Sequence, residues 1–373
     1  MRILIDYRPA LRHRTGVGLW VQKLVEALAA LDGNDALAIT VFSSSWKDRL
    51  SGALPTGVDR VDRRIPVKIL NWLWHHRESP AVETLTSSLF DVVHSPSPLL
   101  IPSRHAAQLV TIHDTDFLVH PHHGPREIRN DYPVLARTHA HRADGVIVPS
   151  SYTGDEVART LQLPRERITV CPNGAPRWTV RSQPPDNGHI LFVGTIAPRK
   201  NIDRLLTAYA ALRTQREGVP PLVLAGQANP EAAPTLARLS VAPLAGHVHL
   251  TGYVDEARLL ALYREAVLVV LPSLDEGFGI PALEAMTLGI PLVAARRGAL
   301  PEVIGDAALF FDPLNIPAIT AALNRMLTDP TLRDRLVATG LTRAPLFSWR
   351  SSANSLVEAY AKAIARRQAA KPH

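Results

Sequence analysis

Short apolar runs of strand length alternate along the first half of the chain with segments whose apolar residues recur at helical spacing. This alternation predicts a parallel sheet covered by helices on both faces, the doubly wound α/β arrangement. Ligands of such sheets collect where a strand ends and a helix starts. We expect helices at 17–30, 67–88, 126–141 and 151–161, and strands at 2–6, 37–43, 90–93, 108–112, 144–148 and 167–170.

Residues 174–188 interrupt this alternation with a stretch rich in Pro, Gly and polar residues, as expected of a domain linker. The alternation then restarts, and Asn201 is placed to cap the helix after the first new strand. We expect strands at 189–194, 221–226, 247–252, 266–273 and 291–295, and helices at 255–265, 281–288, 315–327, 330–341 and 349–367. The sequence therefore predicts two Rossmann-like domains, residues 1–175 and 176–348, facing a central cleft, followed by a terminal segment at 349–373.

The composition narrows the class of protein. The 373 residues carry a formal net charge of +7, with the basic excess spread along the chain, which favours anionic small molecules or anionic membrane over a nucleic-acid partner. The single cysteine, Cys171, excludes an internal disulfide framework and a Cys-rich zinc site, and fits a reducing compartment. The chain shows neither an apolar run long enough to span a membrane nor the pattern of a signal peptide. We therefore expect a cytoplasmic protein.

A glycine loop, Thr15-Gly16-Val17-Gly18, lies between the first predicted strand and the helix after it. Glycines let the backbone approach a ligand closely, and the free amides of a helix N-terminus attract an anion. The full dinucleotide fingerprint is absent, since Val21 stands where its third glycine would be. By itself the loop is compatible with either a phosphate site or a plain strand–helix turn.

Two cations, Arg199 and Lys200, follow the strand predicted at 189–194 and precede a helix. The point charge of a lysine and the planar fork of an arginine both suit phosphate oxygens. Cations at a helix N-terminus oppose the helix dipole, so their placement costs stability unless an anion arrives. This favours a phosphate site over the alternative, a solvated basic turn.

The third motif runs from Glu276 to Glu284 and contains a glycine loop, with Pro281 near the first helical position. Glu276 belongs to the loop after a buried strand, and Glu284 lies on the first turn of the helix, directed back toward the same cleft. Two carboxylates in a cleft of this size can accept hydrogen bonds from neighbouring sugar hydroxyls. The alternative is a pair of surface glutamates, which the intervening glycines make less favourable.

This segment resembles the E-x7-E signature of retaining glycosyltransferases with the GT-B fold, particularly sequence family four. Trp349 and the helix after it resemble the segment that crosses back to the first domain of that family. The chain departs from the family at Thr15, where many members carry a glycine. Further segments resemble the family in the same order along the chain, at 15–18, 110–121, 143–157, 168–174, 192–201, 250–263 and 298–313.

The resemblance implies a role for each matching residue. Arg199 and Lys200 hold the diphosphate of the donor, Glu284 binds the nucleotide ribose, and Glu276 contacts the transferred sugar. His113 lies at the reaction centre. The other donor-binding residues that the resemblance implies are Gly16 and Gly18 at the diphosphate, Tyr253 and Val254 by the base, the amides of Phe278 and Gly279 beside the sugar, and Ile280.

The implied reaction is transfer of a hexose from a nucleoside diphosphate sugar to a hydroxyl, with retention of anomeric configuration. The family needs no bound divalent metal and no resident cofactor. Segment 194–201 is most similar to members that use GDP-mannose for bacterial surface polysaccharides, so mannose is the first choice and a glycan or lipid-linked glycan the expected acceptor. Two alternatives stay open: another GT-B enzyme, such as a sugar-nucleotide epimerase, and a catalytically silent sugar-nucleotide-binding subunit.

Histidines in the first domain have alternative interpretations. His113 follows a buried strand, and without the resemblance it is best interpreted as a hydrogen-bonded structural residue. The imidazoles of His120, His122 and His123 could converge on a metal ion. A solvated loop is the interpretation that the sequence favours for them, so no metal site is expected.

The segment 63–77 combines cations with an apolar, tryptophan-containing helix. Ile65, Ile69, Trp72 and Leu73 can share one face at helical spacing, so an ordinary helix that buries this face is one interpretation. The other is that Trp74 and the arginines stay exposed and hold the enzyme on anionic membrane. Peripheral contact with the inner face of a membrane is therefore an expectation to be tested.

Overall fold

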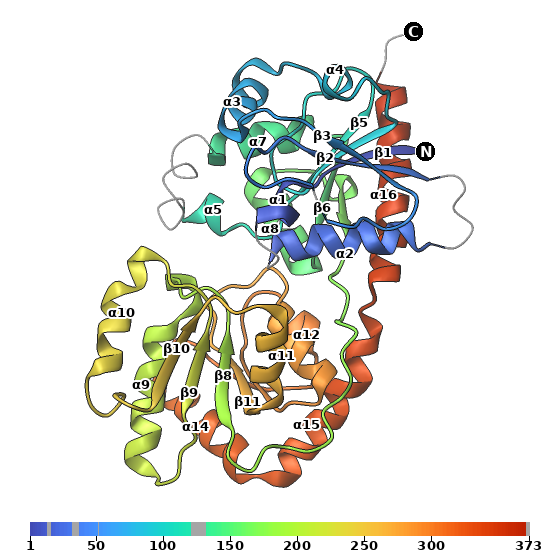
Figure 1. Cartoon of the computed structure of the whole chain (residues 1–373). Coiled ribbons are helices and arrows are strands. Elements are labelled where there is room, and N and C mark those ends of the chain that lie inside the picture. Colours follow the sequence, from blue (N-terminus) through green and yellow to red (C-terminus); the bar gives the residue numbers. More distant parts are fainter. Residues whose placement is uncertain (13–15, 32–36, 51, 121–131, 371–373) are drawn as a thin grey trace. The chain divides into compact units, whose positions relative to one another are not determined.

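The computed structural model describes residues 1–12, 16–31, 37–50, 52–120 and 132–370, and the chain divides into two compact units (Figure 1). Unit 1 comprises Met1–Gly174 and Ser348–His373, and unit 2 comprises Ala175–Phe347. Each unit is built on one parallel sheet, so the prediction of two doubly wound α/β domains is confirmed. Among the described residues, none of the helices combines the length and the apolar character needed to cross a bilayer.

The sheet of unit 1 has the strand order β3-β2-β1-β4-β5-β6-β7. The chain therefore builds outward from β1 to β3, then returns to the other side of β1, and the direction of winding reverses between β1 and β4. Strand β3 was not expected, because its short polar sequence VDRVD shows little of a strand pattern, and pairing with β2 defines it. The strands are β1 (Arg2–Asp6), β2 (Ala38–Ser43), β3 (Val58–Asp62), β4 (Val92–Ser95), β5 (Ala107–Thr111), β6 (Gly145–Val148) and β7 (Ile168–Val170).

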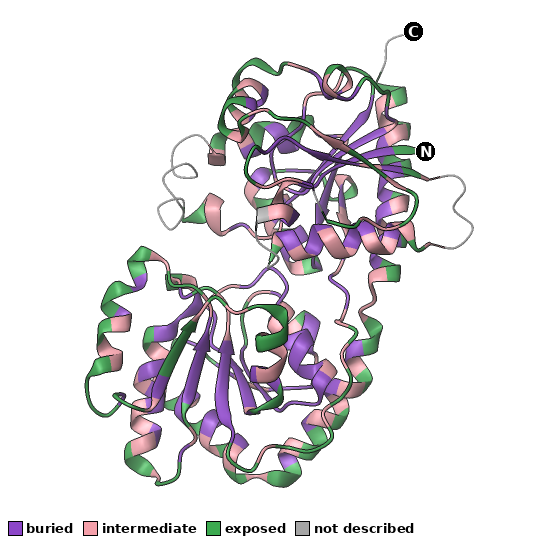
Figure 2. Ribbon diagram, in the orientation of Figure 1, coloured by how far each residue is buried: buried purple, intermediate pink, exposed green. Residues whose placement is uncertain are grey.

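Helices cover both faces of this sheet. Ile3 and Ile5 of β1 pack in the cluster that includes α2 and α16, whereas Leu4 between them packs in the cluster of α3 and α4. Figure 2 shows the central strands buried between these layers. Among the described residues of unit 1, the helices are α1 (Arg8–Arg12), α2 (Val17–Ala29), α3 (Val67–Arg77), α4 (Val82–Thr86), α5 (Asp116–Val119), α7 (Tyr132–Arg142), α8 (Ser151–Leu161) and α16 (Trp349–Ala369).

Two of the helices expected in unit 1 differ from the prediction. The helix expected at 67–88 is two helices, because Glu78 adopts the left-handed conformation (φ 51°) and Pro80 cannot continue a helix. The helix expected at 126–141 begins at Tyr132, and the predicted residues before it lie outside the described part of the chain.

The C-terminal helix α16 is anchored in unit 1. The hydroxyl of Tyr360 lies 2.8 Å from Nδ1 of the buried His94, and the thiol of Cys171 donates to the carbonyl of Ser352 over 3.1 Å. A Cβ atom at Gly174 would lie 2.4 Å from the backbone nitrogen of Trp349, so the close approach of these two chain segments requires glycine. The helix therefore completes the core of unit 1 although it follows the whole of unit 2 in sequence.

The sheet of unit 2 has the strand order β10-β9-β8-β11-β12-β13, with its winding reversed between β8 and β11. Helix α9 packs against α14, and α12 packs against α11, α13 and α15. The strands are β8 (His189–Val193), β9 (Leu222–Ala225), β10 (Val248–Gly252), β11 (Ala266–Leu271), β12 (Leu292–Ala295) and β13 (Leu309–Phe311). The helices are α9 (Ile202–Gln215), α10 (Ala233–Ala237), α11 (Glu256–Arg264), α12 (Ile280–Leu288), α13 (Leu300–Ile304), α14 (Ile316–Thr328) and α15 (Pro330–Arg343).

The elements of unit 2 that the sequence pattern missed are β13, α10 and α13. Each has only three to five residues, too few for a helical or strand period to stand out. They acquire regular structure from neighbours: β13, for example, pairs in parallel with β12.

Candidate active site

A buried ion cluster lies at the reversal point of the sheet in unit 2. Arg199 and Lys200 follow β8, and Glu276 follows β11, the neighbouring strand. The carboxylate of Glu276 accepts a hydrogen bond from Nζ of Lys200, and its other oxygen lies 3.5 Å from Nη1 of Arg199. Lys200 and Glu276 are each 7% exposed. Because the carboxyl ends of strands at such a reversal form the ligand crevice of doubly wound folds, this cluster is the first candidate for an active site.

The charge that offsets Arg199 and Lys200 comes from the protein itself, which differs from the expectation. An arriving anion was expected to offset the cations at the start of α9, but Glu276 already provides a negative charge beside them. Burial alone would raise the pKa of Glu276, yet the charges of Lys200 and Arg199, with hydrogen bonds from Lys200 and Ser273, lower it below its usual value. Glu276 is therefore ionised near neutral pH and holds the two cations in place.

Asn201 does not cap α9 in the manner expected. Its backbone is left-handed (φ 59°), and its side-chain amide donates to the carbonyls of Pro272 (3.0 Å) and Pro313 (2.8 Å). The amide of Leu274 also donates to the carbonyl of Arg199 over 2.8 Å. Asn201 thus ties the cation-bearing turn to the chain that leads into the Glu276 loop.

Gly298 fixes the other side of the Glu276 loop. It has a φ of +60°, and a Cβ atom there would lie 2.6 Å from the nitrogen and 2.7 Å from the oxygen of Glu276. The neighbouring amide of Ala299 donates to the same carbonyl of Glu276 over 2.9 Å. Only glycine permits this close approach, so residue 298 contributes to the position of a side chain 22 residues earlier.

Glu284 lies in α12 and is 6% exposed, so it is not a surface carboxylate. The hydroxyl of Tyr263, on α11, donates to its Oε2 over 2.6 Å. Burial raises the pKa of Glu284 to about 7, against the opposing effect of the Tyr263 hydrogen bond and with a small further increase from Glu256. This carboxyl group therefore changes charge near neutral pH. Helix α12 starts at Ile280, so Glu284 lies just beyond the first helical turn in which it was expected. Pro281 is the second residue of the helix.

The shifted pKa of Glu284 predicts a pH dependence of stability. Its pKa lies above the usual value of 4.5 in the fold, so the protonated form is favoured by folding, and this contribution is lost as the pH rises from about 4.5 through 7. Between pH 5 and pH 8 the free energy of unfolding should fall by roughly 2–3 kcal/mol more in the wild type than in Glu284→Gln, which cannot ionise. Urea unfolding of both proteins at the two pH values measures this difference. An equal change in the free energy of unfolding between pH 5 and pH 8 in both proteins would contradict the prediction.

The other expected donor-binding residues of unit 2 lie near the starts of α11 and α12. Tyr253 is half exposed and Val254 is partly buried, just before Asp255, which caps α11. The ring of Phe278 is buried against Phe347, with centroids 5.7 Å apart. Gly279, at φ 98°, precedes Ile280, the first residue of α12. The backbone between Phe278 and Ile280 therefore enters a helix N-terminus, where partial positive charge accumulates.

The expected residues of unit 1 meet around Trp20. Gly16, with φ 56°, precedes α2, Gly18 is buried in its first turn, and Trp20 follows in the same helix. The ring of Trp20 stands edge-on to that of His113, with centroids 5.0 Å apart. The glycine loop and His113 thus belong to one neighbourhood of unit 1. Thr15 lies outside the described residues.

His113 is held as a neutral imidazole. Its Nε2 lies 3.2 Å from the carbonyl oxygen of Pro96, which can only accept, so Nε2 carries the hydrogen. Burial lowers the pKa of His113 to about 4, although the charge of Asp114 and the Pro96 hydrogen bond act in the opposite direction. The remaining nitrogen, Nδ1, is then an acceptor at neutral pH.

The possible metal site at His120, His122 and His123 is only partly covered by the structure. His120 is exposed, whereas His122 and His123 lie outside the described residues. Within the part of the chain that the structure describes, no group of three or more His, Cys, Asp or Glu side chains is arranged to hold a metal ion. The interpretation of this segment as a solvated loop stays a prediction.

Two contributors to the site were not identified from the sequence. The hydroxyl of Ser273 donates to Glu276 over 2.8 Å, and Tyr263 holds Glu284. Ser273 lies three residues before Glu276 in the same loop, a spacing that could have suggested it. Tyr263 lies on another helix, and its apolar surroundings in the sequence indicated only a core residue.

Comparisons with known proteins identify the family of the two parts of the chain. The family profile described as "Glycosyltransferase Family 4" matches residues 14–178, and that described as "Glycosyl transferases group 1" matches residues 179–343. The chain is 27% identical to the O-antigen chain mannosyltransferase B of Escherichia coli, over 96% of this chain and 99% of that protein.

Two further similarities are partial or limited to the fold. The chain is 34% identical to the MMP alpha-(1->4)-mannosyltransferase of Mycolicibacterium hassiacum, over 59% of this chain and 54% of that protein, so the match spans about half of that relative. Its fold is similar to that of the sucrose-phosphate synthase of Thermosynechococcus elongatus, with a TM-score of 0.77 at 20% identity, over 98% of this chain and 99% of that one.

Proposed function

Because the chain belongs to the group 1 glycosyltransferases with a family 4 N-terminal domain and a GT-B fold, we propose that it is a retaining hexosyltransferase. In this proposal a nucleoside diphosphate sugar donates the hexose to a hydroxyl of a glycan or lipid-linked glycan. Unit 2 binds the donor nucleotide and unit 1 binds the acceptor.

The ion cluster of Arg199, Lys200 and Glu276 is the observation that carries the proposal. Breaking the bond between the anomeric carbon and the diphosphate oxygen places negative charge on the departing diphosphate. Preorganised cations stabilise such charge with little reorganisation. As the anomeric carbon becomes oxocarbenium-like, the acceptor oxygen forms the new bond on the leaving-group face, and its proton passes to the diphosphate. Glu276 positions the sugar and the cations and is not the nucleophile.

Each of the remaining residues contacts a different part of the donor or the reaction centre. Glu284 accepts hydrogen bonds from the ribose hydroxyls, Tyr253 and Val254 lie by the base, and the backbone at Phe278–Ile280 contacts the sugar and diphosphate. Gly16 and Gly18 allow the first loop to approach the diphosphate. His113, neutral and with Nδ1 available as an acceptor, receives a hydrogen bond from a hydroxyl at the reaction centre.

Mannose carried by GDP is the proposed donor. The support is the similarity to proteins named as mannosyltransferases, one of them over almost its full length. The test is a screen of GDP-mannose, UDP-glucose and UDP-N-acetylglucosamine by calorimetry and by release of the nucleotide. GDP-mannose should bind most tightly, and the glycoside formed should keep the anomeric configuration by NMR. Epimerisation of the donor without transfer, or binding without turnover in the presence of acceptors, would overturn the proposal.

Contact with anionic membrane is the second part of the proposal, but not through the tryptophan expected. Trp74 is 1% exposed and donates to the carbonyl of Pro80, so its predicted exposure was wrong. The expected buried face was wrong as well: Ile69 and Trp72 are 54% and 52% exposed, and α3 instead buries Leu70 and Trp74. Trp72 and Ile69 form an exposed surface, the α3 patch, together with Arg63, Arg64, Lys68 and Arg77.

Sedimentation with vesicles tests the α3 patch. Wild-type protein should bind vesicles containing phosphatidylglycerol, and the binding should fall with salt. Removing three charges in Arg63→Ala, Arg64→Ala, Arg77→Ala should weaken binding by roughly 100-fold, because each basic residue near the surface contributes about 1 kcal/mol. The matched control, Arg258→Ala, Arg264→Ala, Arg335→Ala in unit 2, loses the same charge and should retain binding. Equal losses in both variants would assign the binding to net charge alone.

A further inference from the structure

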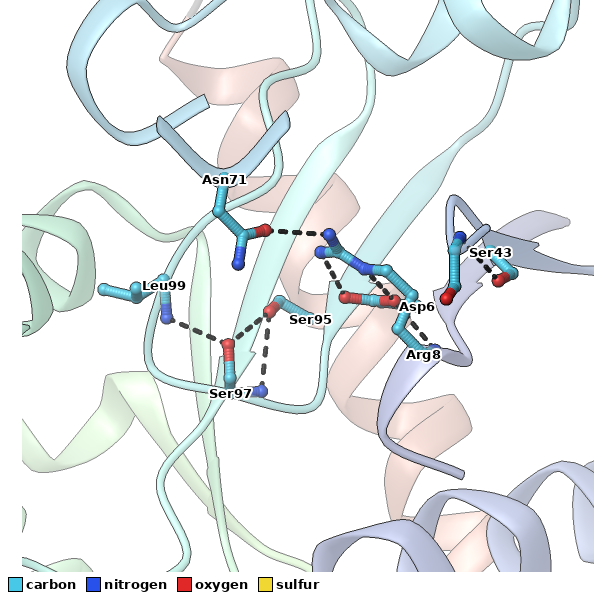
Figure 3. Close-up of polar contacts among 8 residues, drawn as sticks. Asp6, Arg8, Ser43, Asn71, Ser95, Ser97 and Leu99 are labelled. Atoms are coloured by element: carbon cyan, nitrogen blue, oxygen red, sulfur yellow. Dashed lines mark hydrogen bonds and ion pairs between the residues drawn. The ribbon is translucent and has the colours of Figure 1, made fainter. Parts of the chain in front are cut away.

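Unit 1 has a polar cluster at the reversal point of its own sheet. The winding reverses between β1 and β4, so a ligand crevice is expected at the carboxyl ends of these strands. The register that pairs Ile5 with His94 brings Asp6, the last residue of β1, beside Ser95, the last residue of β4 (Figure 3). In unit 2 the corresponding position holds the ion cluster already described.

An ion pair forms the centre of this cluster. Arg8 binds Asp6 at two points, through Nε to Oδ1 (2.8 Å) and Nη2 to Oδ2 (2.7 Å), and its Nη1 donates to Oδ1 of Asn71 over 2.8 Å. Figure 3 shows the guanidinium between Asp6 and Asn71. The ring of Trp74 lies against it, 4.9 Å from the guanidinium carbon. Asp6 is 5% exposed, whereas Arg8 and Asn71 are only partly buried, so the pair is reached from the side of these two residues.

Hydroxyl groups also lie at the carboxyl ends of the neighbouring strands β4 and β2 (Figure 3). The hydroxyls of Ser95 and Ser97 lie 3.1 Å apart, and the hydroxyl of Ser97 also accepts a long hydrogen bond of 3.4 Å from the amide of Leu99. Ser44, next to the end of β2, is fully buried, and among the described residues its hydroxyl has no hydrogen-bond partner. Unused capacity also exists in the guanidinium, which has five N–H groups, and in the amide nitrogen of Asn71, which has two.

We propose that Asp6, Arg8, Asn71, Ser95 and Ser97 bind the acceptor, and that this acceptor presents a neutral diol of a saccharide rather than a phosphate or carboxylate. Asp6 neutralises Arg8, so the pair carries no net charge. A sugar hydroxyl both donates and accepts, which matches a carboxylate and a guanidinium held side by side. Because the charge of Arg8 is already balanced by Asp6, the pair offers a phosphate or carboxylate no net electrostatic attraction. This inference rests on the proposed transferase function.

Matched acceptors test the charge preference. Transfer from GDP-mannose is measured to a panel of neutral methyl glycosides and to the same sugars carrying a 6-phosphate. The neutral member of a pair should be the better acceptor, with at least a tenfold higher kcat/KM. A consistent preference for the phosphorylated members would overturn the proposal.

Two substitutions test the residues. Asn71→Ala and Ser97→Ala should each raise the acceptor KM roughly three- to tenfold more than the donor KM, the effect expected for the loss of one neutral hydrogen bond. Asn71→Ala also removes a hydrogen-bond partner of Arg8 and could prevent folding. In that case Ser97→Ala, which removes a single hydroxyl, provides the test. Thr84→Ala, exposed on α4 of the same unit, is the control and should change neither constant. An unchanged acceptor KM in both folded variants would contradict the assignment.

NMR measures the binding of the glycosides to the full chain in the absence of donor. This measurement separates the acceptor site from the proposed transferase function. If glycosides bind and Asn71→Ala weakens the binding while GDP-mannose is not turned over, the donor assignment fails and the acceptor site stands. If GDP-mannose is hydrolysed while glycosides bind wild type and both variants alike, the transferase proposal stands and the acceptor site is wrong.

Discussion

Replacing Lys200 by alanine should lower the rate of sugar transfer by roughly 10²–10³-fold, as expected for the loss of one preorganised group that stabilises the leaving diphosphate. The same change should reduce stability, because Lys200 is buried against Glu276. Breaking a buried ion pair costs about 3–5 kcal/mol, and the remaining partners of Glu276, Arg199 and Ser273, should keep the loss near the lower end.

The two effects of Lys200→Ala are separated by measuring single-turnover rates at saturating donor and correcting for the folded fraction from thermal unfolding. Arg343→Ala is a suitable control. Arg343 donates through Nε to the carbonyl of Val303 and through Nη2 to that of Glu302, both in α13, and it is not among the residues assigned to donor binding. The Arg343→Ala variant should be less stable than the wild type, but its folded fraction should transfer sugar at the wild-type rate. Near-normal transfer by folded Lys200→Ala would show that this lysine does not act on the leaving group.

The second large effect is expected from replacing Glu276 or Glu284 by glutamine. The first substitution should lower turnover, and the second should weaken donor binding. Glu276→Gln keeps the shape of the side chain but removes the charge that holds Lys200 and Arg199, so turnover should fall by roughly 100-fold. Glu284→Gln should mainly weaken donor binding, by roughly 10–100-fold, because hydrogen bonds to the ribose form in the ground and transition states alike.

The pKa of Glu284, raised to about 7, gives this comparison an internal control. At pH 8 the wild-type carboxyl group is ionised, and the donor affinities of wild type and Glu284→Gln should differ most. At pH 6 it is largely protonated, and the difference should shrink. Calorimetry at both pH values, with single-turnover rates for both variants, measures the division of roles. Identical profiles for Glu276→Gln and Glu284→Gln would show that the two glutamates do not divide the work in this way.

The doubly wound α/β class followed from periodicity, whereas the GT-B assignment came from the resemblance to the family. The alternation of apolar runs with helical periods identified the central strands of both sheets, because a strand buried on both faces is apolar along its whole length. The elements that were missed, such as β13 with three residues and β3 at a sheet edge, lack that signature. Their regular structure depends on pairing with β12 and β2, which a local pattern does not record.

Candidate residues were identified from the sequence, but their partners were not. Arg199 and Lys200 were identified as cations placed before a helix N-terminus, and Glu276 and Glu284 as two carboxylates on either side of a glycine loop. That Lys200 is paired with Glu276, or that Tyr263 holds Glu284, was not predicted. The same holds for Trp74, whose exposure depended on whether α3 turned it toward Phe42 or toward solvent.

The sequence by itself determined the two parallel sheets and the residue types available at each strand end, because these depend on neighbours along the chain, and its motifs carried the resemblance to the family. Only the tertiary structure decided which of those residues meet. Lys200 and Glu276 are 76 positions apart, and Arg8 and Asn71 are 63 apart. Asn71 contacts Arg8 from helix α3, whereas the strand order of unit 2 brings Lys200 and Glu276 together, because the sheet reverses its winding beside its first strand and places chain-distant carboxyl ends side by side.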